Sequence, residues 1–470
     1  MQNSQLITIF RSLSSKEVRS LRKWLLSPVH NQREDVVRLF DYLIHTEHLN
    51  NEKSLQKDKV FAKVFPKQKY DDALLRQSMH FLLKSVEEFL AFQDWSEDPA
   101  RLRLALAGVY RKRKLDKVFL KTIKSIETLQ QSHPYRDEHY LRNEYLLLQE
   151  QYVYLEGKRR IVPMNLQEIS DKLDLTYCAD KLRQSCLMLS HQKVYKAQYN
   201  AGLLQEVLQY VVEQDLLEVP AIAIYYYVYQ ALTAKESETF FYKLKETIGR
   251  HWALFPKEEM RDMYLMAINY CIGRMNAGYE VFVREAFDLY RQGFQRELLI
   301  ENNLISKFTF LNVIRIGLKL KEFSWVSDFI NSHQQFIEAP YRDNIVRFSL
   351  ARLDFEKGDY DSAMKILVQA DFDDVLVYLS AKAMLIRMYY EQSEFDALES
   401  LLESMRTYLN RKDMIGGQQK ILYGNLVRFT KKLIHLNPYN NKAPLQKLKE
   451  EVAKVNVAEK EWLLQQLEEL

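Results

Sequence analysis

The chain has 470 residues, of which 47% are hydrophobic, and it contains only 12 glycines and 10 prolines. Turn-rich β architectures need Gly and Pro at short intervals, so this composition argues against them and favours an all-α fold. The formal net charge of +4 is too small to indicate nucleic-acid binding by itself.

Residues 1–97 are predicted to form a small helical domain. Apolar residues at helical spacing indicate helices over 15–26, 34–45, 57–65 and 70–92, and Ser15 is expected to cap the first of them. The domain is interpreted as a cap on the rest of the chain or as a helix-turn-helix-like unit. Residues 1–125 contain 24 Lys and Arg against 15 Asp and Glu, and this excess keeps the second interpretation open.

A polar segment that contains Pro99 is predicted to separate this domain from a second one over 100–438. From Leu102 onwards, apolar helical stretches alternate with short polar turns at spacings of roughly 34–45 residues. A single helical hairpin cannot bury its apolar stripe, whereas stacked hairpins bury it continuously. We therefore predict an α-solenoid of about eight stacked helical hairpins.

An internal repeat of about 35 residues is clearest within 347–408. The segment Gly358-Asp359-Tyr360-Asp361 aligns with Ser393-Glu394-Phe395-Asp396. Each copy places this polar turn between two apolar helices, which is the pattern of a helical-repeat array.

The stretch 350–367 resembles a tetratricopeptide repeat (TPR). The resemblance depends on Ala351 in the first helix, on the turn at Gly358 and on Ala363 in the second helix. The next copy departs from the pattern, with Ser393 in place of the turn glycine. The resemblance implies a TPR-like right-handed superhelix whose concave face binds peptides or partner helices, and it implies no enzymatic chemistry.

Residues 439–470 are predicted to form a C-terminal capping helix. Leucines and valines recur at helical spacing from Leu445 to Leu467, and the intervening residues are mostly charged. One helix with a charged outer face is typical of the end of a solenoid.

Arginine recurs at one position of the aligned repeats, at Arg315, Arg352 and Arg387. Three residues after each lies an apolar or aromatic side chain: Leu318, Phe355 and Tyr390. In TPR-like repeats both positions face the inner groove, so these six residues are candidates for binding an acidic peptide or a phosphate group. The alternative is that the arginines form i,i+4 ion pairs on solvated helix faces, such as those with Glu356 and Glu391.

Two predicted turns are rich in cations: Arg111, Lys112, Arg113 and Lys114 in the first, and Lys158, Arg159 and Arg160 in the second. If the turns stack along one edge, they form a basic ridge that attracts nucleic acid or an acidic partner in a salt-dependent manner. The alternative is that the cations lie in ordinary solvated turns, since no aromatic residues are interleaved for base stacking.

Three cysteines (Cys178, Cys186 and Cys271) show no paired spacing, which indicates free, buried thiols in a reducing compartment. The amino terminus lacks the apolar core of a signal peptide, and the most apolar run, 221–229, is far shorter than the roughly 20 residues of a membrane span. We therefore expect a soluble, cytoplasmic protein.

The sequence contains no phosphate-binding glycine loop, dinucleotide fingerprint or nucleophile elbow. Neither catalysis, a metal nor a cofactor is expected. We predict a non-enzymatic scaffold or adaptor that binds a protein or peptide in the concave groove of the solenoid, with an acidic segment as one candidate partner. The alternative is a nucleic-acid-associated regulator that uses the basic amino-terminal region, with the solenoid as its sensor. The oligomeric state stays open.

Overall fold

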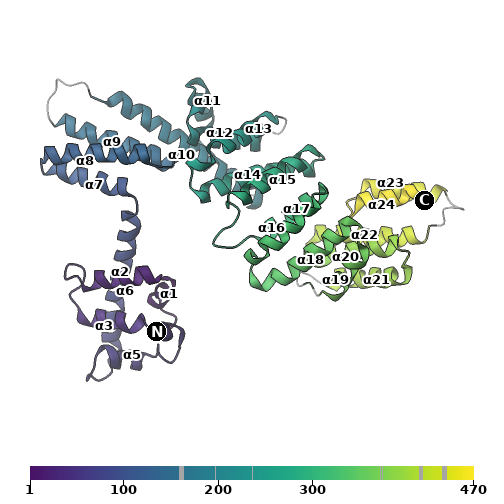
Figure 1. Ribbon diagram of the computed structural model, residues 1–470, viewed down its shortest axis with the longest axis horizontal. Helices are drawn as coiled ribbons and strands as arrows, with labels where there is room; N and C mark the ends of the chain where they lie inside the picture. Colours follow the sequence, from purple (N-terminus) through teal and green to yellow (C-terminus); the bar gives the residue numbers. More distant parts are fainter. Residues whose placement is uncertain are drawn as a thin grey trace. The chain divides into compact units, whose positions relative to one another are not determined.

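The computed structural model describes residues 1–157, 164–195, 197–234, 237–370, 372, 374–411, 416–436 and 442–470. These residues form α-helices joined by turns and contain no β-strand, so the all-α prediction is confirmed (Figure 1). The chain divides into two compact units, Met1–Lys181 (unit 1) and Leu182–Leu470 (unit 2). The division falls inside helix α10 (Leu166–Tyr195).

The first six helices of unit 1 share a hydrophobic core of their own. They are α1 (Gln5–Ser12), α2 (Ser15–Leu26), α3 (Glu34–Leu43), α4 (Thr46–Asn50), α5 (Lys57–Val64) and α6 (Asp72–Ser96). Fully buried Phe40 and Leu82, from α3 and α6, belong to this core. Four helices match the predicted ranges to within a few residues, whereas the sequence pattern predicts neither α1 nor α4.

Helix α2 shows how local sequence sets a helix start. The side chain of Ser14 accepts a hydrogen bond from the backbone N–H of Glu17 at 3.3 Å, and the Glu17 carboxylate accepts one from the backbone N–H of Ser14 at 2.7 Å. This capping box holds the pKa of Glu17 below its usual value. The cap is therefore Ser14, and the prediction of Ser15 is wrong by one residue because Ser15 is already helical.

The rest of unit 1 consists of α7 (Pro99–Lys112), α8 (Asp116–Ser132), α9 (Glu138–Glu156) and the first part of α10. Asp98 caps α7, because its carboxylate accepts hydrogen bonds from the backbone N–H groups of Ala100 and Arg101. The predicted break near Pro99 therefore lies between α6 and α7, inside unit 1. Helix α7 packs against both α8 and α9.

Unit 2 contains fourteen further α-helices in its described part. They are α11 (Leu204–Glu213), α12 (Pro220–Thr233), α13 (Thr239–His251), α14 (Lys257–Asn276), α15 (Val281–Gln295), α16 (Lys307–Lys319), α17 (Phe323–His333), α18 (Ala339–Lys357), α19 (Tyr360–Gln369), α20 (Val375–Glu391), α21 (Phe395–Arg411), α22 (Gly417–Ile434), α23 (Lys442–Lys454) and α24 (Lys460–Glu469). Four of these helices pack both against the helix that follows and against the helix after that: α12, α16, α18 and α20. Figure 1 lets the reader follow this pairing from α16 to α22.

One kind of turn ends three of these helices. Lys321, Gly358 and Ser393 follow α16, α18 and α20 with left-handed φ values of 58°, 83° and 61°. In each turn the next backbone N–H donates to a carbonyl five residues earlier, at 3.0, 2.9 and 2.8 Å, respectively. This is the Schellman motif of helix ends, and only the glycine adopts it without a steric cost from its own Cβ.

Replacing Ser393 with glycine is expected to raise the free energy of unfolding by about 1 kcal/mol, because the left-handed conformation no longer opposes a Cβ atom. Gly358→Ala should lower it by a similar amount for the same reason. Urea denaturation followed by circular dichroism measures both changes. Equal stabilities of the two variants and the unsubstituted protein would contradict this account of the turns.

The C-terminal segment forms two helices where the sequence predicts one. Helices α23 and α24 pack against each other and against α22, and Glu459, directly before α24, has a left-handed φ of 53°. The chain changes direction here because apolar side chains on both helices, including Val452 and Trp462, enter the core built around Leu426 of α22. A single straight helix could not direct both sets of side chains into one core.

Two further expectations concern membranes and thiols. Among the residues that the structure describes, no helix has both the length and the apolar character needed to cross a membrane. Cys178, Cys186 and Cys271 are free and buried, as predicted. Burial raises the pKa of the Cys178 thiol to about 11, with a smaller contribution from Asp174, and burial also raises the pKa values of the other two thiols.

Candidate functional site

Helices α16, α18 and α20 position three arginines, Arg315, Arg352 and Arg387, which we call the arginine cluster. Helix α18 packs against both α16 and α20, so equivalent positions on the three helices come close together. The positive charge of Arg315 acts on Arg352, and the carboxylate of Glu459 acts on both Arg352 and Arg387. The structure therefore brings together three residues that the repeat alignment placed at one position.

Arg352 is the central member of the cluster. It is enclosed by protein on most sides and retains partial contact with solvent. Burial lowers the pKa of its guanidinium, while attraction to Glu356 and Glu459 acts in the opposite direction. Within the described part of the chain, neither Arg352 nor exposed Arg315 forms a hydrogen bond or an ion pair. An arginine stays charged under these conditions, so two cations of the cluster lack a direct counter-ion.

Arg387 differs from the other two because protein groups hold its guanidinium in place. Its Nη1 atom lies 2.9 Å from the Glu459 carboxylate, and its guanidinium carbon lies 4.6 Å above the centre of the Phe355 ring. The Trp462 ring lies at 5.9 Å. Arg387 thus connects α18, α20 and α24, and its contribution includes packing as well as charge.

The predicted i,i+4 ion pairs are not those that form. Glu391 accepts hydrogen bonds from the Trp462 indole N–H at 2.9 Å and from the Tyr360 hydroxyl, while Arg387 pairs with Glu459. Glu356 attracts Arg352 without reaching ion-pair distance. Tyr360 of α19 and Trp462 of α24 therefore bind Glu391, and Glu459 replaces Glu391 as the partner of Arg387. Helical spacing in the sequence does not reveal these partners.

The apolar members of the predicted groove lie deeper than their arginines. Leu318 and Phe355 are 3% and 5% exposed, and Phe355 stacks on the Tyr360 ring at 5.4 Å. Tyr390 is half-buried, with its ring 5.6 Å from that of Trp462. In this conformation Leu318 and Phe355 stabilise the core and are not accessible to a partner.

Two tyrosines with polar neighbours flank the cluster, and repeat alignment does not identify them. Burial raises the pKa of Tyr290 to about 12, although Arg315 and a hydrogen bond with Asn312 act against this increase. The hydroxyl groups of Tyr423 and Ser380 lie 3.2 Å apart, and the charges of Arg352 and Glu459 act on Tyr423. These groups extend the polar surroundings of the arginines across α15, α16, α20 and α22.

The predicted basic ridge is described only in its first half. Lys112, Arg113 and Lys114 are exposed at the end of α7. Arg111 is half-buried, with Nε and Nη2 at 2.5 and 3.3 Å from the two carboxylate oxygens of Glu150. This bidentate ion pair raises the pKa of Arg111 and connects its side chain to α9. Lys158, Arg159 and Arg160 lie outside the described residues.

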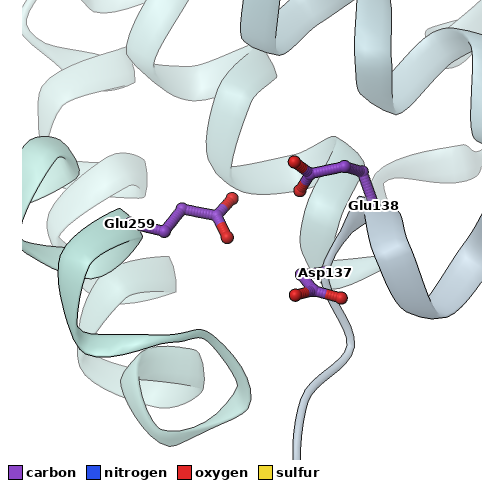
Figure 2. A group of neighbouring side chains, drawn as sticks. All are labelled: Asp137, Glu138 and Glu259. Atoms are coloured by element: carbon purple, nitrogen blue, oxygen red, sulfur yellow. The ribbon is translucent and has the colours of Figure 1, made fainter. Parts of the chain in front are cut away.

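Several buried or partly buried carboxylates lie at helix starts (Figure 2). Asp137 caps α9 in unit 1 by accepting a hydrogen bond from the backbone N–H of Tyr140 at 2.9 Å, and Glu138 occupies the first turn of the same helix. In unit 2, Glu259 occupies the first turn of α14 and accepts a hydrogen bond from the Tyr225 hydroxyl. Acidic side chains at these positions are favourable because the helix dipole is positive at its amino end.

Comparison of the chain with protein-family models, curated proteins and solved structures finds no match.

Proposed function

We propose that this protein is a non-enzymatic, TPR-like helical-repeat scaffold that binds an acidic segment of a protein partner at the arginine cluster. Two features support the repeat: the recurring packing of α16, α18 and α20, and the shared turn at Lys321, Gly358 and Ser393. The turns are 37 and 35 residues apart, which is the spacing of the arginines as well. A stack of such units presents equivalent residues along one face.

We infer an acidic partner because neither Arg315 nor Arg352 has a direct counter-ion within the described residues. Glu459 already occupies the end of the cluster beside Arg387, so the cluster accommodates a carboxylate at hydrogen-bonding distance. An incoming Asp or Glu side chain would meet two further guanidinium groups. Hydrogen bonds between charged groups contribute about 1.5–3 kcal/mol each.

Substitution of Arg315 and Arg352 by glutamine is expected to weaken the binding of acidic peptides about tenfold or more, because two charge-assisted contacts are lost. The measurement is fluorescence anisotropy with two sets of labelled peptides of equal length and matched sequence, one rich in Glu and the other with Gln at the same positions. Affinity for the Glu set should also fall with rising salt.

The matched control is Arg347→Gln on the same helix α18, because Arg347 is exposed and pairs locally with Asp343. It removes one charge outside the cluster and should leave affinity unchanged. Equal binding of the Glu and Gln peptides, or unchanged binding by the double variant, would contradict the proposal. Arg387 is left intact because its removal would disturb the packing of Phe355 and Trp462.

The exposed run Lys112–Lys114 supports the alternative of a nucleic-acid-associated regulator that uses the basic amino-terminal region. A labelled oligonucleotide in the same assay tests it. Salt-dependent binding that is lost when these three residues become glutamine would favour the alternative over the peptide-binding scaffold.

A further inference from the structure

A cavity of about 430 Å³ lies between α21 and α22, on elements other than those that carry the arginine cluster. Four cations line it: Arg406 from α21, and Lys420, Arg428 and Lys431 from α22. No acidic residue is among the described residues that line this cavity. The surrounding sequence is strongly basic as well, since residues 406–449 contain ten Lys or Arg and a single Asp.

Two of the four cations remain without a carboxylate partner. Glu403, outside the cavity, pairs with Lys431 at 2.7 Å and approaches Arg406 at 3.9 Å. Half-buried Lys420 forms no hydrogen bond or ion pair within the described ranges. Arg428 lies with its guanidinium carbon 4.4 Å from the centre of the Phe429 ring. Its charge acts on Glu451 from beyond ion-pair distance, while Glu451 pairs with Lys432 at 2.6 Å. The cavity therefore has a net positive charge.

The floor of the cavity is apolar and open. Leu409 and Val427 form part of it and are 5% and 4% exposed. Gly424 lines the cavity at the middle of α22, and a Cβ atom added there would meet no other atom within 4 Å. The glycine thus leaves space in which an organic group could lie against Leu409 and Val427.

We propose that this cavity binds a small phosphate monoester, with the phosphate held by Lys420 and Arg428 and the organic group placed over Gly424. A phosphate monoester carries about −1.5 to −2 charges at neutral pH, which matches two cations that lack a direct ion-pair partner. Guanidinium pairs with phosphate oxygens as a fork, and the lysine adds a point charge. The volume lies within the range of about 300–1,000 Å³ that is typical of small-molecule sites.

The test uses the full chain and isothermal titration calorimetry with phenyl phosphate, which combines a phosphate monoester with a compact apolar ring. Sedimentation with vesicles that contain phosphatidic acid forms a second arm, because a lipid headgroup offers the same phosphate. Saturable binding in either arm is expected, and the arm that binds more tightly identifies the source of the phosphate. Lys420→Gln and Arg428→Gln should each weaken it about tenfold.

Two further variants separate a specific site from general attraction to positive charge. Gly424→Leu fills the cavity without a change in charge, improves local helix propensity and should abolish binding. Lys365→Gln removes an exposed charge on α19 and should leave binding unchanged. The Arg315 and Arg352 substitutions should also leave binding of the phosphate probe unchanged. A failure of this inference can therefore be distinguished from a failure of the proposed function. The proposal would be overturned if neither arm shows saturable binding or if Gly424→Leu still binds. It would also be overturned if Lys365→Gln weakens binding as much as Lys420→Gln or Arg428→Gln does.

Discussion

Replacement of Trp462 by alanine is expected to lower the free energy of unfolding of unit 2 by about 3–5 kcal/mol. Trp462 is 4% exposed and belongs to the core shared by α20 to α24. Its indole N–H donates to Glu391 at 2.9 Å, and its ring lies 5.6 Å from that of Tyr390. The substitution leaves a cavity and removes a hydrogen-bond partner from Glu391. Guanidinium denaturation followed by circular dichroism at 222 nm measures the loss.

Trp462→Phe serves as the matched control because it retains an aromatic ring and removes the indole N–H. It should lower the free energy of unfolding clearly less than the alanine variant does. Hydrogen exchange of the α24 amides should accelerate in Trp462→Ala and remain slow elsewhere in unit 2 if α24 detaches locally. Wild-type stability of the alanine variant would show that α24 is not part of this core.

Replacement of Gly317 by alanine is expected to lower the free energy of unfolding by about 1–3 kcal/mol, in spite of the better helix propensity of alanine. A Cβ atom at Gly317 would lie 2.6 Å from Cγ2 of Val326 and 3.3 Å from Cε2 of Phe287. Both neighbours are fully or almost fully buried, so they have little room to move. The same denaturation experiment measures this change.

The matched control is Gly273→Ala near the end of α14, where an added Cβ would meet no atom within 4 Å. This variant should be more stable than the unsubstituted protein by about 0.5–1 kcal/mol, because alanine favours the helical backbone. If alanine lowers the free energy of unfolding at Gly317 and raises it at Gly273, then close contact with α15 and α17 requires glycine at Gly317. Stabilisation in both variants would show that this part of the core adapts freely.

The sequence predicts the helices and turns of this protein well where local signals decide them. The turn at Gly358 is recognisable because glycine tolerates the left-handed conformation, and the repeat alignment extends it correctly to Ser393. The polar segment that contains Pro99 is recognisable for a similarly local reason, and α7 begins there. Prediction is less accurate at the C-terminal segment, where one continuous helical pattern conceals the break at Glu459. Apolar spacing on both sides of the break fits a helix, and only the shared core requires the reversal.

The repeat alignment identifies the arginine cluster but not the partners of its members. Arg387 and Glu459 are 72 residues apart in the sequence, and no periodicity connects them. The local pairing of Arg387 with Glu391 gives way because Trp462, brought in by α24, takes the Glu391 carboxylate. The cavity beside Gly424 is likewise invisible in the sequence, because it requires the side chains of α21 and α22 to face each other.

The amino-acid sequence by itself determined the all-α class, the positions of α2, α3, α5 and α6, the turns at Gly358 and Ser393, and the free state of the three thiols. These properties depend on backbone preferences, apolar spacing and cysteine spacing, which act over a few residues. The tertiary structure alone decided which arginines keep a counter-ion, which apolar residues are covered and where a charged cavity opens. Such properties depend on contacts between helices distant in the chain, and a change of direction of a few residues, as at Glu459, alters all of them.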